Sequence, residues 1–373
     1  MVYLSIISAI LLFHYARMIF QFRSGWLKLP EINTGHHFHG RVFISVIIPF
    51  RNEEENLLKL VKNLSEQRFS PHHMEIVLVD DHSTDNGFET AKQLQKSHQW
   101  LKIVSSKKQG KKAALRSGIS SATGELIVTT DADCHFSRDW LQTIAETYLE
   151  KNPDMIVMPV GMESGKRWID RFQQNDYLAL QLATAGAMGN GNPIISSGAN
   201  LAFKKKSFLE TSKNIQGTQY LSGDDVFLLH TFKSQSFRII YLKSAQAMAK
   251  TYPADSLKQF LLQRMRWGGK SKGYEDHFAR NTALTILIVN TFIAIMPFIA
   301  LFFGIQFFTI WVAAVLIKTS ADWSLLNSGK SFFSVRTGLP AFLSFSLIYP
   351  YYILTAGVGS LFIRESWKDR KGR

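Results

Sequence analysis

Long apolar runs near both ends of the chain limit what it can fold into more than any other feature. They occupy residues 3–22, 282–304, 305–317 and 339–363. A helix crosses a bilayer with about 20 apolar residues, so the first, second and fourth runs are long enough. The third is a marginal span unless it extends towards Leu326, and Pro350 should kink the fourth. The sequence therefore predicts a membrane-embedded chain.

The first apolar run is interpreted as an uncleaved anchor over residues 1–22. The alternative is a signal peptide, but no basic segment precedes the run and no A-x-A pattern follows it. Arg17, Arg23 and Lys28 lie towards its C-terminal side, and the positive-inside rule then leaves the next domain in the cytoplasm. We therefore expect a multi-pass protein of the cell (inner) membrane with a cytoplasmic catalytic domain.

The C-terminal half presents a topological conflict. Residues 281–363 hold three apolar runs, and the basic tail 364–373 should remain cytoplasmic. Three full crossings from a cytoplasmic domain would place that tail outside. One of the three runs is therefore expected to be re-entrant or interfacial, and the sequence does not identify which.

Between the anchors, residues 42–160 alternate between strand-like and helix-like segments. The strand-like runs are 42–49, 75–80, 102–105, 125–130 and 155–160. The helix-like stretches between them are 53–66, 87–98, 111–121 and 138–150. Continuous apolar strands separated by helices indicate an α/β domain with a mostly parallel sheet covered on both faces.

Polar residues gather after each of the first four strands, where α/β sheets bind ligands. The segments are "PFRNEEEN" (49–56), "DDHSTD" (80–85), "KKQGKKAAL" (107–115) and "DADC" (131–134). They contain neither a G-x-G-x-x-G turn nor a P-loop. Asp131 and Asp133 stand two apart on an extended strand end, so both carboxylates can face one site. A divalent cation, Mg²⁺ or Mn²⁺, bridging a diphosphate fits these groups.

Composition narrows the class of partner. The formal net charge of +14 suits an anionic partner, whether nucleic acid, an acidic membrane surface or a phosphorylated substrate. The basic residues lie largely beside the apolar runs and the expected diphosphate site, and no nucleic-acid-binding motif is present, so nucleic acid is not expected. The lone Cys134 excludes an internal disulfide and is interpreted as a small buried filler.

Seven motifs together resemble the membrane-bound family 2 glycosyltransferases, which include polysaccharide synthases and lipid glycosyltransferases. They are "SVIIPFRNEEENL" (45–57), "VDDHSTD" (79–85), "GKKAALRSGI" (110–119), "TTDADC" (129–134), "SSGANLAFKK" (196–205), "SGDDVFL" (222–228) and "QRMRW" (263–267). The similarity covers about residues 42–270. It implies a GT-A fold, a nucleotide-sugar donor and inversion at the anomeric carbon.

The resemblance implies a role for each residue on the donor side. Asp81 matches the aspartate that contacts the nucleotide base, and Asp80 beside it is a weaker candidate. Asp133 matches the metal-binding aspartate of the D-x-D motif, and Asp131 would hold the ribose or share the cation. Lys111 matches a basic residue that contacts the nucleotide.

On the acceptor side, the resemblance assigns the catalytic base to Asp225. Asp224 precedes it where the family has glutamate, which affects the positioning partner more than the base. The Q-x-x-R-W motif corresponds to Gln263, Arg266 and Trp267, which share one face of an amphipathic helix. Two further departures, His82 for a glycine and Arg116 for an asparagine, remove no proposed catalytic group.

Several of these features have plainer interpretations. Ser222, Asp224 or Asp225 could cap a helix that begins near 224. Asn200 could bond a hydroxyl of the substrate or belong to a tight turn before a strand. Residues 166–186 resemble an interfacial helix or a core helix equally. Arg264 and Arg266 could pair with lipid phosphates at a membrane surface. The histidines of "GHHFHG" (35–40) are taken as a solvated loop rather than a metal site.

These observations define an expected organisation and function. The domains are an anchor (1–22), a cytoplasmic GT-A domain (42–255), an interfacial helix (256–280), membrane helices (281–363) and a basic tail (364–373). The expected enzyme is a hexosyltransferase-type glycosyltransferase that moves a sugar from a UDP-sugar donor to a lipid or growing glycan. An oligomer or a co-synthase could supply missing channel helices. The alternative is a catalytically silent, membrane-anchored nucleotide-sugar-binding partner of another synthase.

Overall fold

The computed structural model describes residues 2–32, 41–212, 215, 223–362, 366–367 and 370–371. The chain divides into two compact units. A helical unit comprises Met1–Leu29, Ser164–Ile194 and Pro253–Ile363, and a sheet unit comprises Pro30–Glu163, Ile195–Tyr252 and Arg364–Arg373. The expected continuous segment 42–255 is therefore interrupted, because residues 164–194 belong with the helices.

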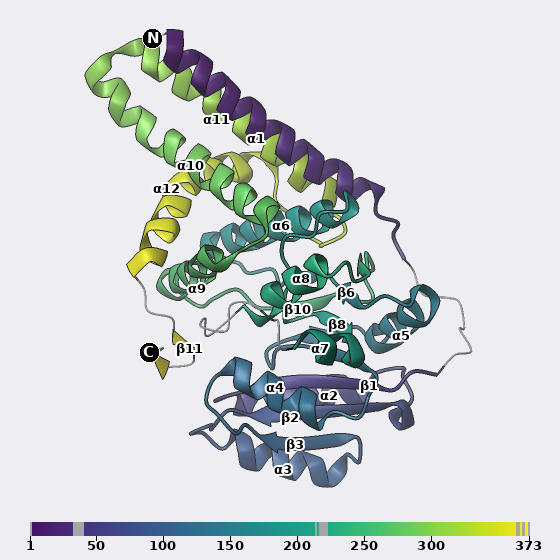
Figure 1. Ribbon diagram of the computed structural model, residues 1–373. Coiled ribbons are helices and arrows are strands. Elements are labelled where there is room, and N and C mark those ends of the chain that lie inside the picture. Colours follow the sequence, from purple (N-terminus) through teal and green to yellow (C-terminus); the bar gives the residue numbers. More distant parts are fainter. Residues whose placement is uncertain are drawn as a thin grey trace. The chain divides into compact units, whose positions relative to one another are not determined.

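Seven strands form the main sheet within the described part of the sheet unit, in the order β3-β2-β1-β4-β8-β6-β9 (Figure 1). Their bounds are β1 Ile44–Phe50, β2 Met74–Asp80, β3 Leu101–Ser105, β4 Leu126–Thr129, β6 Met155–Val157, β8 Leu201–Lys204 and β9 Ile239–Tyr241. The first four are parallel to one another, and β8 runs antiparallel to both β4 and β6. The mixed α/β class with a mostly parallel sheet is confirmed.

The central strands are buried on both faces, which explains their unbroken apolar sequence. Every residue of β1 is buried, and β1 pairs in register with β2, so that Phe50 stands opposite Asp80. Full burial of a valine, leucine or isoleucine side chain contributes about 1.5–3 kcal/mol, which makes these strands the core of the unit. Their carboxyl ends reach the same edge of the sheet.

Helices connect the parallel strands at the positions that the sequence predicts. They are α2 Glu54–Ser65, α3 Gly87–Ser97, α4 Lys111–Ser121 and α5 Trp140–Lys151, with α7 Lys205–Thr211 and α8 Asp224–Ser234 further on. Close packing fixes α4: a Cβ on Gly118 would lie 2.5 Å from Ile47 Cγ2 and 2.8 Å from Val79 Cγ2. Only glycine lets α4 approach β1 and β2 this closely.

Short strands complete the sheet unit. The strands β5 (His135–Phe136), β10 (Ala249–Thr251) and β7 (Val160–Met162) form a small sheet, in which β10 is antiparallel to β5 and parallel to β7. β11 (Ser366–Trp367) pairs with β12 (Arg370–Lys371) near the C-terminus. The small sheet follows directly from the Asp131–Asp133 segment, because β5 begins two residues after Asp133.

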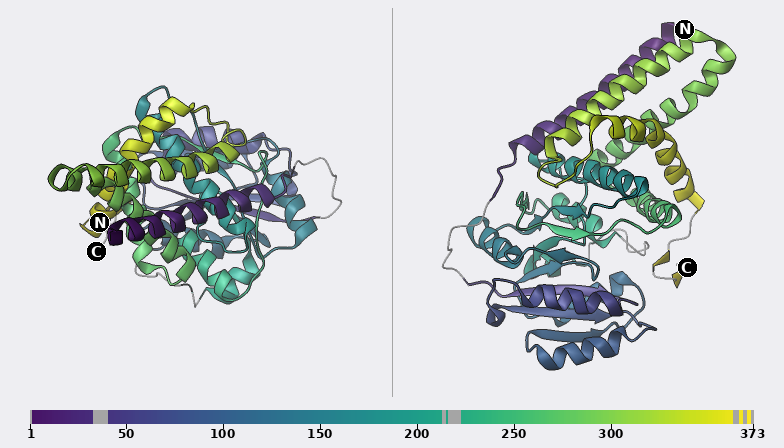
Figure 2. Two further views of the ribbon diagram at one scale, coloured as in Figure 1. Left: turned by 90° about the horizontal axis from the view of Figure 1, so that it is seen from above. Right: turned by 180° about the vertical axis from the view of Figure 1, so that it is seen from behind.

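The helical unit contains α1 Val2–Lys28, α6 Trp168–Gly189, α9 Leu257–Lys270, α10 His277–Phe303, α11 Ile305–Gly329 and α12 Leu339–Phe362. Four helices in the described residues are long and apolar enough to cross a membrane: Ser5–Lys28, His277–Phe303, Ile305–Gly329 and Leu339–Phe362. The marginal third run does extend, since α11 continues past Leu326. α1 and α11 run alongside each other (Figures 1 and 2).

Backbone contact between α1 and α6 supports the core-packing interpretation of residues 166–186. A Cβ on Gly186 would lie 2.0 Å from the carbonyl oxygen of Phe22, and one on Gly189 would lie 2.1 Å from that of Gly25. Lys28 Nζ also donates to Asn190 Oδ1 at 3.2 Å. α6 is therefore a packed core helix of the helical unit, held by small residues as membrane helix pairs often are.

Candidate active site

The first residues of α4 contact aspartates from three different segments of the sheet unit. Gly110, with φ of 107°, precedes the helix and donates its N–H to Asp81 Oδ1 at 2.9 Å. Lys111 Nζ then pairs with Asp131 Oδ1, and Lys112 Nζ pairs with Asp224 Oδ1 at 3.1 Å. The helix N-terminus thus gathers carboxylates that are far apart in the sequence.

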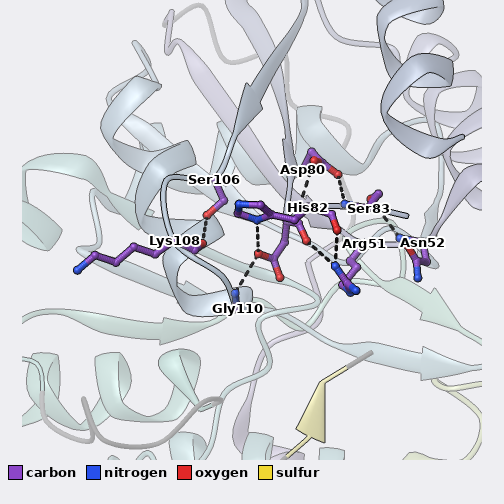
Figure 3. Close-up of polar contacts among 9 residues, drawn as sticks. Arg51, Asn52, Asp80, His82, Ser83, Ser106, Lys108 and Gly110 are labelled. Atoms are coloured by element: carbon purple, nitrogen blue, oxygen red, sulfur yellow. Dashed lines mark hydrogen bonds and ion pairs between the residues drawn. The ribbon is translucent and has the colours of Figure 1, made fainter. Parts of the chain in front are cut away.

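Asp80, the last residue of β2, contacts the loop that follows it (Figure 3). Asp80 accepts from the N–H of His82 at 3.1 Å and of Ser83 at 3.0 Å, which holds His82 at a φ of 55°. Asp81 has no exposed surface, and Arg51 donates to the carbonyl oxygens of Asp81 and His82. The Asp80 carboxylate therefore shapes this loop directly, whereas the Asp81 carboxylate accepts from Gly110 N at the start of α4.

Asp131 and Asp133 follow β4 as the sequence predicts, separated by the buried Ala132. Burial raises the pKa of Asp133, and the negative charges of Asp131 and Glu53 raise it further against the opposing effect of Lys111. Burial lowers the pKa of Lys111, but its contact with Asp131 and the charges of Asp225 and Asp133 raise it overall. These groups therefore interact as one cluster, in which negative charge is in excess.

Asp224 and Asp225 are the first two residues of α8, which Gly223 precedes. Asp225 Oδ2 accepts from Gly198 N at 2.8 Å, so the segment before β8 orients this carboxylate. Burial raises the pKa of Asp224, while Lys112 lowers it. Both aspartates line a small cavity of about 50 Å³ that continues to Leu228 between apolar side chains. The capping interpretation does not hold for these two aspartates, because Gly223 is the N-cap residue and no described side chain caps the helix; Asp225 Oδ1 instead accepts from Val226 N at 2.9 Å within the first turn.

Asn200 does not fit its expected role in binding substrate. It has no exposed surface, and its amide already makes three hydrogen bonds. Its Oδ1 accepts from Trp140 Nε1 at 3.1 Å, and its Nδ2 donates to Pro159 O at 2.7 Å and to Ala247 O at 2.8 Å. This expectation is corrected: Asn200 joins neighbouring segments of the sheet unit, because its short amide is saturated by buried partners.

The Q-x-x-R-W residues lie on α9 in the helical unit. Gln263, Arg266 and Trp267 are each half-buried. The buried Arg264 between them donates to Gln263 Oε1 at 2.7 Å, and its guanidinium lies 4.2 Å from the Trp267 ring centroid. Arg264 also pairs with Asp176 Oδ2 at 2.7 Å, so a protein carboxylate satisfies it rather than a lipid phosphate. That part of the membrane-surface interpretation is wrong.

Sequence reasoning missed several residues that the fold brings to the aspartates. Lys112 pairs with Asp224, Gly198 orients Asp225, and Thr251 Oγ1 lies 3.4 Å from Asp133 Oδ2. The doubled lysine of "GKK" was an available signal for Lys112. The motif "SSGANLAFKK" marked Gly198 as a place of close backbone approach but not as a partner of Asp225, and nothing local marked Thr251, because both act through contacts between distant segments.

Two expectations fall on residues outside those that the structure describes. They are the histidine cluster at 35–40 and the capping role of Ser222. Among the described residues, no group of three or more histidine, cysteine, aspartate or glutamate side chains has the arrangement of a metal site. Asp131 and Asp133 remain a pair of oxygen donors, which is the number that Mg²⁺ commonly takes from protein beside substrate phosphates.

Comparison with known proteins identifies the class. Residues 45–211 match the family model described as glycosyl transferase family 2. A solved structure, the mannosyltransferase PcManGT from Pyrobaculum calidifontis in complex with GDP-Man and Mn²⁺, matches 96% of this chain and 98% of its own with a TM-score of 0.60. At 20% sequence identity this likeness defines the fold, which is the GT-A fold.

Two curated relatives are also glycosyltransferases by name. A dolichyl N-acetyl-alpha-D-glucosaminyl phosphate 3-beta-D-2,3-diacetamido-2,3-dideoxy-beta-D-glucuronosyltransferase from Methanococcus voltae is 25% identical over 74% of this chain and 86% of its own length. Glycosyltransferase AglE from Haloferax volcanii is 31% identical over 31% of this chain, and the match spans only 38% of that relative. The chain is therefore a glycosyltransferase of the hexosyltransferase type whose residues 45–211 match the family 2 model, and its described residues include four helices long and apolar enough to cross a membrane.

Proposed function

We propose that this protein is an inverting glycosyltransferase that moves a sugar from a nucleotide-diphosphate donor to a lipid or growing glycan acceptor. The contact of α4 with Asp81, Asp131 and Asp224 is the observation that carries the proposal. We expect the donor to be a UDP-sugar and the reaction to occur at the cytoplasmic face of the cell (inner) membrane. The dolichyl phosphate in the name of the Methanococcus voltae relative supports a lipid-linked acceptor.

The donor would bind over the N-terminus of α4. Backbone N–H groups and the helix dipole favour a diphosphate there, and Lys111 and Lys112 add positive charge. Asp81 and Asp80 frame the loop proposed to hold the nucleotide base. Lys111 would exchange its partner Asp131 for a phosphate oxygen, which leaves that carboxylate for the ribose or a cation.

The residues present fit a divalent cation. Asp133 and Asp131 supply hard oxygen donors, and the pKa of Asp133 is raised first by burial and then by the negative charges of Asp131 and Glu53. When bound, Mg²⁺ or Mn²⁺ would neutralise charge that develops on the departing diphosphate. The Mn²⁺ in the PcManGT complex supports this assignment.

Asp225 is the proposed catalytic base. Gly198 N holds one carboxylate oxygen, which fixes the carboxylate without neutralising it. A base in this position takes the proton of the attacking hydroxyl, and direct attack on the anomeric carbon inverts it. Gln263, Arg266 and Trp267 are proposed to bind the acceptor or the leaving diphosphate, and Asp224 to position the base.

The alternative remains a catalytically silent partner that binds a nucleotide sugar for another synthase. It shares the donor site and differs only in turnover. Both Asp133 and Asp225 are present, which favours the enzyme.

The decisive experiment offers labelled UDP- and GDP-sugars to membranes that contain the full-length protein. Label should enter either a lipid extract or a high-mass polymer. Asp225→Asn should lower transfer by about 10²–10⁴-fold while nucleotide binding persists, as loss of a general base predicts. Wild-type transfer by this variant excludes Asp225 as the base, and nucleotide binding without any turnover by the wild-type protein supports the silent partner.

A further inference from the structure

An amphipathic groove of about 420 Å³ lies between α1 and α10 in the helical unit. Its α1 wall includes His14, Arg17 and Gln21. Its α10 wall includes Asn281, Leu284 and Ile288. The volume lies within the range of ligand sites, roughly 300–1,000 Å³. Both helices are long and apolar enough to cross a membrane, so a lipid is the ligand class that such a groove suits.

Arg17 gives the groove its charge. It is an exposed arginine within the span Ser5–Lys28, and it makes no ion pair or hydrogen bond among the residues that the structure describes. The nearby Asp322 is not its partner, because that carboxylate accepts from Tyr15 at 2.6 Å and from Lys318 at 2.6 Å. A charge inside a membrane span is costly without an anionic or polar partner.

Polarity changes along the groove in the order that a lipid requires. In the proposed topology, the C-terminal end of α1 and the N-terminal end of α10 both face the cytoplasm. Gln21 and Asn281 lie towards these ends and form the polar end of the groove. Further into the spans Leu284 and Ile288 make the α10 wall more apolar, although His14 on α1 and Thr285 on α10 also line the groove there. Exposed Ile10 and Phe13 continue this apolar surface on α1. Headgroup-binding and chain-binding parts therefore follow each other along one direction.

We propose that this groove binds a phosphate-headed lipid of the bilayer, with Arg17 donating to the lipid phosphate and Leu284 and Ile288 packing against the chain. An arginine fork suits a phosphate, and charge-assisted hydrogen bonds of this kind are short and strong. Asn281 and Gln21 supply neutral donors at the same end. The proposal concerns lipid binding and does not depend on the transferase activity.

The test is native mass spectrometry of the purified full-length protein titrated with phosphatidylglycerol and with diacylglycerol of the same acyl chains. The wild type should bind phosphatidylglycerol in one saturable step, in preference to diacylglycerol. Arg17→Gln should weaken phosphatidylglycerol binding about tenfold, the effect of losing one charge-assisted hydrogen bond, and leave diacylglycerol unchanged. Arg23→Gln, on the same helix but outside the groove, is the matched control and should bind like the wild type.

A second variant keeps the test decisive if Arg17→Gln does not fold. Leu284→Trp fills the groove from an already exposed position and should reduce binding of both lipids. An excess of inorganic phosphate should not displace the lipid, which separates a lipid site from a simple anion site. The proposal is overturned if Arg17→Gln prefers phosphatidylglycerol over diacylglycerol as strongly as the wild type does. It is also overturned if Arg17→Gln and Arg23→Gln lose the same amount of phosphatidylglycerol binding.

Discussion

The sheet unit and the helical unit both hold buried or half-buried charges, but they balance them differently. At the edge of the sheet, Lys111 and Lys112 face four aspartates, Asp131, Asp133, Asp224 and Asp225. In the helical unit two buried cations each have their own anion: Arg264 pairs with Asp176 and Lys318 with Asp322. Tyr349 and Tyr352 also donate to Asp176, at 3.2 and 3.3 Å, and complete that network.

This difference distinguishes charges that are proposed to bind a ligand from charges that stabilise the packing of helices. Matched pairs with additional hydrogen bonds satisfy themselves, and they fix how helices pack. Repulsion in a cluster with surplus negative charge is relieved by a proton or by a bound cation, and a cation is the ligand proposed for these carboxylates. Neutralising one carboxylate should therefore affect activity in the sheet unit and stability in the helical unit.

The largest expected effect is on catalysis, from Asp133→Asn. Removing a proposed cation ligand should lower sugar transfer by about 10³-fold, comparable to losing an electrostatic stabiliser of the transition state. The melting temperature in the absence of ligand should stay the same or rise, because a repelling charge is removed. Labelled-sugar transfer and thermal unfolding measure the two effects. A lower melting temperature would place Asp133 among the scaffold charges.

Asp176→Asn should show the opposite pattern. It leaves Arg264 buried without a counter-charge, which should reduce the free energy of unfolding by about 3 kcal/mol, the lower end for breaking a buried pair, since Gln263 still accepts from Arg264. Thermal unfolding in detergent measures the change. The double variant Asp176→Asn/Arg264→Met is the control and should recover part of the loss. If the double variant is no more stable than Asp176→Asn, the loss of stability does not come from the unpaired charge of Arg264.

Gly118→Val tests whether packing of α4 positions the site. The new side chain collides with Ile47 and Val79, and overpacking of this kind costs about 1–3 kcal/mol. Because α4 must move away from the sheet, nucleotide binding should weaken together with stability. Ser120→Val, at an exposed position of the same helix, is the matched control. Unchanged nucleotide affinity in Gly118→Val would separate the packing of α4 from the donor site.

The smallest expected effect comes from Glu75, on β2 away from the proposed site. Burial raises its pKa, but hydrogen bonds from Ser45 and Thr123 and the charge of Lys102 lower it overall. A lowered carboxyl pKa stabilises the fold above the unfolded value of about 4.3, and that contribution disappears as the pH falls through the folded value. Glu75→Gln should therefore be less stable than the wild type, by about 1 kcal/mol at pH 7.

The stability difference between Glu75→Gln and the wild type should vanish in acid. Thermal unfolding from neutral pH down to about pH 3 follows this change. A difference that stays constant over the whole range would mean that shape, rather than charge, stabilises this position. Activity should be unaffected at neutral pH, which contrasts this structural carboxylate with Asp133.

The strands and helices of the sheet unit were predictable because their signals are local. Apolar runs such as 75–80 and the polar stretch 111–121 match β2 and α4 closely. Asp131 and Asp133 could also be assigned to one edge, since parallel strands end together. The role of residues 164–194 could not be assigned: α6 is amphipathic, and its sequence alone does not say which partners cover it. For the same reason, the partner of Arg264 was misjudged.

The sequence by itself determined the order of strands and helices, the apolar spans and the supply of carboxylates and lysines, because each depends on residues close together in the chain. Only the tertiary structure decided that Lys112 meets Asp224, that Gly198 holds Asp225 and that Asn200 is saturated by buried partners. Those contacts join segments separated by tens of residues or more. These contacts form because close packing, as at Gly118, fixes the position of α4 against the sheet.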